Sequence, residues 1–232
     1  MSMTDFQKNY EEVSERIARA CARSVRKPDE VTLVAVSKYV PTERMQEAYD
    51  LGVRTFGENH AQEVHQKQTF FEQPGCGVHF IGHLQTNKLK YVCGSVAIIE
   101  SLDRVSLLEA LRQKQSALGQ VADVLIQDNI GDEAHKGGVA LTELEPFAEQ
   151  VANSECIRLR GLMCVPPALS PEETRPYFTR MRALFEKMRA TYRELPFDTL
   201  SMGMSHDYDV AILEGATEVR VGSALFGARD RK

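Results

Sequence analysis

Short apolar runs recur along the whole chain and alternate with segments whose apolar residues follow helical spacing. Eight runs rich in β-branched and other apolar residues predict strands, at residues 31–36, 53–56, 78–81, 96–99, 121–127, 157–163, 199–202 and 218–221. Most segments between them predict helices, and the longest of these are residues 104–118 and 171–192. A polar amphipathic stretch over residues 5–24 predicts one more helix ahead of the first strand.

This regular alternation of strand and helix predicts a parallel sheet whose strands are joined by helical crossovers. Eight such units in a chain of 232 residues favour a closed (β/α)8 TIM barrel over an open doubly wound sheet. No linker, low-complexity tract or short-period repeat interrupts the sequence. We therefore expect one α/β barrel domain over residues 1–232, with an extra N-terminal helix.

Composition and charge exclude several classes of function. The net charge of −5 gives no basic footprint for nucleic acid, and no apolar run is long enough to span a bilayer. The N-terminus lacks the charged and then apolar pattern of a signal segment, so we expect a cytoplasmic protein. The five cysteines are odd in number and include no CxxC pair, which predicts reduced thiols without a disulfide framework or a structural zinc site.

The carboxyl end of the first predicted strand offers a candidate nucleophile. Active sites of such barrels lie at the carboxyl ends of the strands, and this strand leads directly into Ser37 and Lys38. Alternation along a strand puts Val34, Val36 and Lys38 on one face. If that face points inward, the Lys38 ammonium is partly desolvated, which favours the neutral amine that attacks aldehydes. The alternative is a lysine that leaves the strand into solvent.

The last predicted strand carries an arginine on the face opposite Val219 and Val221. Arg220 shares its face with Glu218, so the guanidinium is expected inside the barrel. A buried charge needs a partner. One interpretation is an internal ion pair with Glu218 or another carboxylate, and the other is that Arg220 points at a ligand.

The last two strands are each followed by small residues. These are Ser-Met-Gly-Met-Ser at residues 201–205 and Gly-Ser-Ala at residues 222–224. Phosphate sites in such barrels often form after strands seven and eight, where glycine lets backbone N–H groups approach an anion and serine adds a donor. Ordinary tight turns are the alternative. Together, an aldehyde-reactive lysine, a phosphate cradle and an inward arginine describe a site for pyridoxal 5'-phosphate (PLP).

Six segments carry a resemblance to a known family. They read AVSK at 35–38, FGEN at 56–59, FIGHLQTNK at 80–88, RGLM at 160–163, SMGMS at 201–205 and VRVG at 219–222. The set closely resembles the YggS/PROSC family, the pyridoxal phosphate homeostasis proteins, in family order from about residue 31 to residue 230. The resemblance implies a single barrel like the N-terminal domain of alanine racemase, with PLP bound and no established turnover.

The resemblance also implies roles for individual residues. Lys38 would hold PLP as a Schiff base, Arg220 would face the pyridine nitrogen, and Asn59 and His83 would be neighbours at the rim. The residues implied around the phosphate are Ser201, Gly203, Gly222 and Ser223. Residues 135–138 read His-Lys-Gly-Gly and depart from the family pattern, so no role is carried over to Lys136.

The chemistry favours a carrier over a dedicated enzyme. An arginine at the pyridine nitrogen disfavours its protonation and makes the ring a poorer electron sink. The resemblance places the second acid/base of two-domain racemases on an added β domain, and this chain ends at Lys232, just past the last predicted strand. Candidate substitutes for that group are Tyr39, Tyr208 and His83, and nothing in the sequence prefers one of them.

We therefore expect a protein of intracellular PLP homeostasis that binds PLP and delivers it to PLP-dependent apo-enzymes. A low-activity fold-type III PLP enzyme, such as an amino-acid racemase, is the alternative, and the sequence leaves open whether any reaction is catalysed. A third hypothesis is a barrel that binds another phosphorylated metabolite without covalent chemistry. A monomer is the default. No metal site is expected, because His79 and His83 lack a third ligand.

Overall fold

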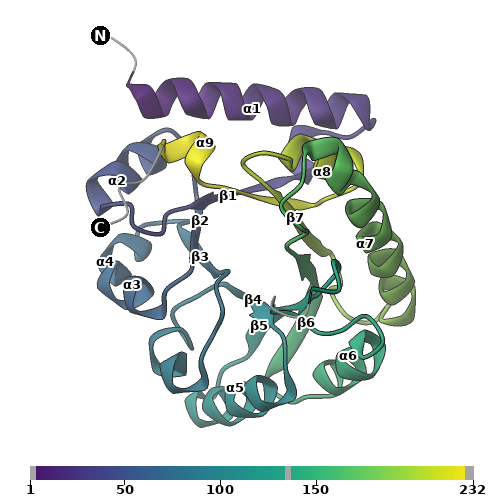
Figure 1. Ribbon diagram of the computed structural model, residues 1–232. Coiled ribbons are helices and arrows are strands. Elements are labelled where there is room, and N and C mark those ends of the chain that lie inside the picture. Colours follow the sequence, from purple (N-terminus) through teal and green to yellow (C-terminus); the bar gives the residue numbers. More distant parts are fainter. Residues whose placement is uncertain (1–3, 134–136, 228–232) are drawn as a thin grey trace.

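Eight parallel strands follow one another in chain order around a closed barrel in the computed structural model, which describes residues 4–133 and 137–227 (Figure 1). The strands are β1 (Thr32–Val36), β2 (Thr55–Glu58), β3 (Gly77–Phe80), β4 (Ile98–Leu102), β5 (Ala122–Asp128), β6 (Ile157–Cys164), β7 (Thr199–Met204) and β8 (Glu218–Val221). The last strand closes the barrel by pairing with the first, with Val34 beside Arg220. The predicted α/β barrel is confirmed.

The helices alternate with the strands and lie outside the barrel (Figure 1). The α-helices are α1 (Asp5–Arg23), α2 (Thr42–Asp50), α3 (Ala61–Gln66), α4 (Gln68–Phe71), α5 (Val105–Leu118), α6 (Leu144–Ala152), α7 (Pro171–Thr191), α8 (Tyr208–Leu213) and α9 (Ser223–Phe226). Two 3-10 helices, η1 (Pro28–Glu30) and η2 (Thr86–Tyr91), complete the described connections. The extra N-terminal helix and the two longest predicted helices are confirmed as α1, α5 and α7.

Local signals explain where the longest helices begin and end. Helix α7 starts after a capping box, in which Ser170 and Glu173 satisfy each other's backbone groups, and Pro171 occupies the first helical position. Helix α5 ends at Gly119, whose φ of 62° lies in the left-handed region that glycine adopts without strain. These signals are local in sequence, which is why the pattern analysis placed both helices closely.

The predicted strand at residues 53–56 is displaced by two residues in the structure. Val53 is buried, but its backbone N–H donates to the carbonyl oxygen of Ala48, 3.0 Å away, as part of the turn that ends α2. The strand β2 therefore starts at Thr55. An apolar residue at a helix end and one in a strand look alike in the sequence, because both are buried.

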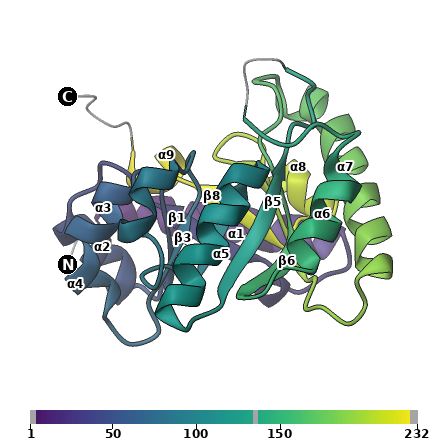
Figure 2. The ribbon, with the colours of Figure 1, turned by 90° about the horizontal axis from the view of Figure 1, so that it is seen from below.

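Helix α1 covers the outside of the barrel next to the strands that close it. Figure 1 shows α1 lying beside α8 and α9, and Figure 2 shows it behind the barrel with α5 and α6 in front. Its buried face includes Phe6, Val13 and Ile17, and the Phe6 ring lies 5.2 Å from the Phe226 ring of α9. The extra helix thus shields apolar surface of the β8 end of the domain.

The barrel interior contains both an apolar cluster and charged side chains. Ile98, Leu125 and Met163 form a buried apolar cluster across β4, β5 and β6. The charged side chains come from β3, β4 and β8 and are described below. Gly57 on β2 allows β1 and β2 to pack closely, because a side chain there would come within 2.8 Å of a Val34 methyl group. Such a polar interior next to strand ends is typical of a binding barrel and costs stability unless every charge is paired.

Three further expectations concern the chain as a whole. All five cysteines are free thiols, as predicted. No helix within the described residues combines the length and the apolar character needed to cross a membrane. Lys136 lies outside the described residues.

Candidate functional site

Lys38 lies in a tight turn at the carboxyl end of β1, at the mouth of the barrel. The turn runs from Ser37 to Val40 and is closed by a hydrogen bond from the Val40 N–H to the Ser37 carbonyl, 2.9 Å long. Lys38 itself is half-buried. Tyr39 follows with a φ of 62°, a left-handed conformation that is uncommon for a bulky side chain. A bulky residue in this conformation indicates that the surrounding structure holds the turn in place.

Arg220 lies inside the barrel, as its position on the strand predicted. Its side chain is 4% exposed, and its Nη2 donates to the carbonyl oxygen of Cys164 over 2.8 Å. Nη1 donates to the Ser201 hydroxyl over 2.5 Å and lies 3.8 Å from Oε2 of Glu100. The internal ion pair is therefore made with Glu100 on β4, while Glu218 has a different partner.

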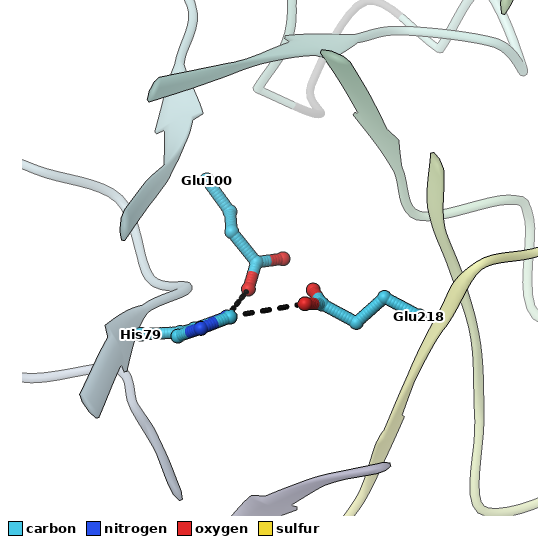
Figure 3. Close-up of side chains that lie close together, drawn as sticks. All are labelled: His79, Glu100 and Glu218. Atoms are coloured by element: carbon cyan, nitrogen blue, oxygen red, sulfur yellow. Dashed lines mark hydrogen bonds and ion pairs between the residues drawn. The ribbon is translucent and has the colours of Figure 1, made fainter. Parts of the chain in front are cut away.

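That partner is His79 on β3, which stands between two carboxylates (Figure 3). Its Nδ1 lies 2.9 Å from Oε1 of Glu100 and 3.3 Å from Oε2 of Glu218, and all three side chains are buried. Burial alone would lower the pKa of His79, but the charges of Glu218 and Glu100 outweigh it and raise the pKa to about 10. A doubly protonated imidazole thus bridges the two carboxylates at neutral pH.

The pKa values of the two carboxylates shift in opposite directions. Burial, followed by the charge of Glu218, raises the pKa of Glu100 to about 7. Burial also opposes ionisation of Glu218, but the charge and hydrogen bond of His79 overcome it and lower the pKa to about 2. The ligand atoms of the three residues lie within 4.8 Å of one another, which is a spacing that a divalent cation could use. A protonated His79 has no lone pair for a metal, so the proton and a cation compete for this position.

Ser201 and Gly203 lie within β7 and not in the loop that follows it. The Ser201 hydroxyl accepts from Arg220 and donates to Oε2 of Glu100 over 2.7 Å. Gly203 is buried against α8 with a φ of 93°, and a side chain there would come within 2.6 Å of the Ala211 methyl group. Ser201 thus supports Arg220, and Gly203 allows α8 to pack closely.

The loops after β7 and β8 are joined by Ser205. Its hydroxyl accepts from the backbone N–H of Gly222 over 3.1 Å and of Ala224 over 3.3 Å. Ser223 between them is exposed and starts α9, and the two backbone N–H groups converge on the Ser205 oxygen at the mouth. Donors arranged in this way suit a phosphate group. Sequence reasoning noted Ser205 in the loop but did not single it out, and its signal was the serine directly after the β7 segment.

Asn59 and His83 lie on the other side of the mouth, after β2 and β3. Both line a pocket of about 230 Å³ whose wall also includes Leu84 and Lys88. The Oδ1 atom of Asn59 is buried and has no hydrogen-bond partner among the described residues. The ring of His83 is largely exposed, 3.5 Å from Asp103, and therefore does not meet the inward His79.

Glu100 is an interior residue that the sequence patterns did not predict. It directly follows the predicted strand at residues 96–99 and shares the inward face of β4 with Ile98. Its signal was a glutamate two residues beyond an apolar inward position. That position predicts a buried carboxylate, but it does not predict which cation forms an ion pair with it.

The chain closely matches known proteins over nearly its whole length. Residues 3–230 match the family model of the alanine racemase N-terminal domain. The pyridoxal phosphate homeostasis protein of Aquifex aeolicus is 43% identical over 94% of this chain and 95% of its own length. The protein of the same description in Escherichia coli K12 is 40% identical over 98% of each chain.

One similar solved structure contains the cofactor. It is that of PipY from Synechococcus elongatus PCC7942 with PLP bound, which is 34% identical, has a TM-score of 0.80, and covers 93% of this chain and 100% of its own.

Proposed function

The chain belongs to the alanine racemase N-terminal domain family and, within it, to the pyridoxal phosphate homeostasis proteins, and from this premise we propose that it binds PLP as a Schiff base on Lys38. Lys38 would supply the amine, Arg220 a hydrogen bond to the pyridine nitrogen, and Ser205, Gly222 and Ser223 the donors for the phosphate.

The observation that carries the proposal is that Lys38 and Arg220 belong to neighbouring strands, because Lys38 follows β1 and Arg220 lies on β8. Arg220 is paired with Val34, four residues before Lys38. Val34 lies two residues before the end of β1, which is roughly 7 Å at about 3.3 Å per residue, and Lys38 follows in the turn beyond that end. Two long side chains would leave room for one aromatic ring between them, with Lys38 toward the aldehyde and Arg220 toward the pyridine nitrogen.

The position of the loop at Gly222 also supports the proposed phosphate site. Gly222 comes directly after Val221, which pairs with Ala35 on β1, so the Gly222 loop lies next to the turn that holds Lys38. The Ser205 hydroxyl already orders the backbone of this loop. Ser201 and Gly203, which the family resemblance would put around the phosphate, support the site from within β7 in this proposal.

Asn59, directly after β2, offers a further contact for bound PLP at the mouth. Its buried Oδ1 is an acceptor that has no hydrogen-bond partner among the described residues, and such atoms are rare unless a ligand or water satisfies them. We propose that Asn59 contacts the polar edge of the bound ring.

PLP supplies an aldehyde when it is bound, and the protein's residues control that aldehyde. The neutral Lys38 amine would replace the C=O bond of the aldehyde by a C=N bond, and the carbonyl oxygen would leave as water with the two amine hydrogens. Because this condensation reverses on hydrolysis, Lys38 both shields the aldehyde from other amines and returns it. Arg220 opposes protonation of the pyridine nitrogen, which suits storage better than carbanion chemistry.

We therefore propose a role in PLP homeostasis, in which the protein acts as a cytoplasmic monomer and hands PLP to PLP-dependent apo-enzymes. Sedimentation of the PLP-loaded protein at increasing concentration measures the oligomeric state. Mixing the loaded protein with an apo-enzyme and following the recovery of that enzyme's activity measures the transfer.

The binding mode is tested by borohydride reduction of the PLP-loaded protein followed by peptide mapping. We expect one modified peptide, carrying the adduct on Lys38, and we expect Lys38→Ala to remove both the adduct and the visible absorbance band. Lys187→Ala, which changes an exposed lysine of α7, is the matched control and should keep both. A Lys38→Ala variant that keeps full affinity for PLP would instead favour non-covalent binding of a phosphorylated ligand.

The alternative function is a low-activity racemase, which needs a second acid/base group at the mouth. Tyr208 does not fit this role, because its ring is buried on α8 with Arg16 of α1 4.6 Å from the ring centroid. Tyr39 is 61% exposed beside Lys38 and fits it better. Incubating the loaded protein with single-enantiomer amino acids decides the matter, with Lys38→Ala as the control for background conversion.

A further inference from the structure

Both peptide groups that flank Lys38 are held by one group of charged side chains. The Ser37 carbonyl, in the peptide before Lys38, accepts from the Lys67 ammonium over 2.9 Å. The Tyr39 N–H, in the peptide after Lys38, donates to Oε2 of Glu63 over 2.8 Å. The same Lys67 ammonium binds Glu63, 2.7 Å away, so the two holding groups are joined to each other.

Glu58 at the end of β2 completes this group, which we call the Lys67 cluster (Glu58, Glu63 and Lys67). Its Oε1 accepts from Lys67 over 2.8 Å and from the Ser37 hydroxyl over 2.6 Å. Glu58 is fully buried, and burial raises its pKa although the charge of Lys67 opposes this. The three hydrogens of the Lys67 ammonium are thus matched by three acceptors, and the ammonium is not a competing nucleophile.

The cluster explains the unusual backbone at Tyr39. A left-handed conformation costs a non-glycine residue free energy relative to its ordinary conformations. The side chain of Tyr39 is largely exposed, and its main described contact is a hydrogen bond to Nε2 of His60, 2.8 Å long. The bond from the Tyr39 N–H to the partly buried Glu63 carboxylate is charge-assisted and therefore stronger than a neutral one. It is the contact best placed to hold this turn.

We propose that Glu63 and Lys67 are positioning residues, which fix the backbone on both sides of Lys38 and so aim its amine at the aldehyde of bound PLP. This inference rests on the proposed function and adds two residues to it. A lysine on a freely moving turn would lose backbone freedom on each condensation, whereas a turn that is already held does not. The cluster therefore strengthens the covalent step and leaves the phosphate and ring contacts unchanged.

The test compares two ligands that share every group except the aldehyde. One is PLP, and the other is 4'-deoxypyridoxine 5'-phosphate, which binds through ring and phosphate but cannot form a Schiff base. The main variant is Glu63→Ala, which removes both bonds of the carboxylate. Glu63→Gln keeps an acceptor for the Tyr39 N–H and should restore function.

The matched control is Glu214→Ala at the end of α8. Glu214 also accepts two bonds, from Arg175 over 2.6 Å and from Thr179 over 2.8 Å, and its side chain is similarly buried. It takes no part in the proposed site. Any effect of losing one paired carboxylate on the fold in general therefore appears in both alanine variants.

We expect Glu63→Ala to weaken PLP binding roughly tenfold, equivalent to about 1.4 kcal/mol, and to change binding of the deoxy analogue less than about twofold. The visible Schiff-base band should fall at subsaturating PLP and return in Glu63→Gln. Equal losses for both ligands, or no loss for PLP, would overturn the positioning role. Failure of the proposed function would look different, because the wild type itself would then lack the band.

Discussion

Arg220 and Glu100 hold one serine hydroxyl between them. Nη1 of Arg220 donates to the Ser201 oxygen over 2.5 Å, and that hydroxyl donates to Oε2 of Glu100 over 2.7 Å. The guanidinium and the carboxylate are themselves 3.8 Å apart in the barrel interior. Two cations, Arg220 and the protonated His79, thus face the ionised Glu218 and Glu100, whose pKa of about 7 makes the buried cluster close to electrically neutral above that pH.

Removing Glu100 should therefore destabilise the protein strongly. At pH 8, where Glu100 is mostly ionised, Glu100→Ala leaves two buried cations with one carboxylate, and we expect the free energy of unfolding to fall by about 3 kcal/mol. Urea denaturation of the PLP-free protein measures this change. Glu145→Ala, which breaks an exposed ion pair with Lys187, should have a much smaller effect. Similar losses in the two variants would contradict the importance of the buried cluster.

His79 should make stability fall as the pH rises above neutral. Its pKa of about 10 in the folded protein lies above the ordinary value of 6.5, so the folded state holds a proton that the unfolded state releases. The stabilisation is complete below about pH 6.5 and is lost as the pH rises toward 10, by about 1.4 kcal/mol per pH unit at most. Chemical denaturation between pH 7 and 9 should show this slope in the wild type and a smaller slope in His79→Gln. Equal slopes would show that His79 does not carry the proton.

Asp128 at the end of β5 should make the stability depend on pH a second time, over a lower pH range than His79. Burial raises its pKa from 3.8 to about 7, so the folded state favours the protonated carboxyl and loses stability as the pH rises between these values. Asp128→Asn has the same shape and no charge. We expect this variant to be more stable than the wild type by more than about 1 kcal/mol at pH 8, and the difference to vanish near pH 4. Thermal unfolding at the two pH values measures it, and an Asn variant that is less stable at pH 8 would refute the prediction.

Ser205→Ala should weaken every ligand that carries the phosphate. The hydroxyl orders the Gly222 and Ala224 N–H groups, so its loss affects PLP and 4'-deoxypyridoxine 5'-phosphate alike, by roughly tenfold. Titration of both ligands distinguishes this result from the aldehyde-selective loss expected for Glu63→Ala. Ser154→Ala, at a half-buried serine after α6, is the control. Unchanged affinity in Ser205→Ala would place the phosphate elsewhere.

Much of the barrel was predictable because its strands and helices follow from short-range sequence patterns. Runs of β-branched residues mark strands such as β1 and β8, and caps such as Ser170 and Gly119 mark the ends of helices. The period of two along a strand also indicated that Arg220 points inward and that Lys38 follows the inward Val34 and Val36. The displacement of β2 by two residues arose where burial alone did not distinguish a helix end from a strand.

The partners of these residues were not predictable in the same way. The sequence left Glu218 and other carboxylates open as partners of Arg220, and the structure supplies Glu100, which is 120 positions away along the chain. Likewise, the serine between the loops is Ser205 and the serine beside Arg220 is Ser201, although both belong to one short motif.

The sequence by itself determined the alternation of strands and helices, the inward face of Arg220 on the last strand, and the position of Lys38 at a strand end. Only the tertiary structure decided that His79, Glu100 and Glu218 meet, and that Glu63 and Lys67 hold the turn around Lys38. The reason is physical: side-chain direction depends on the local backbone, whereas contacts across a closed barrel depend on the register of all eight strands at once.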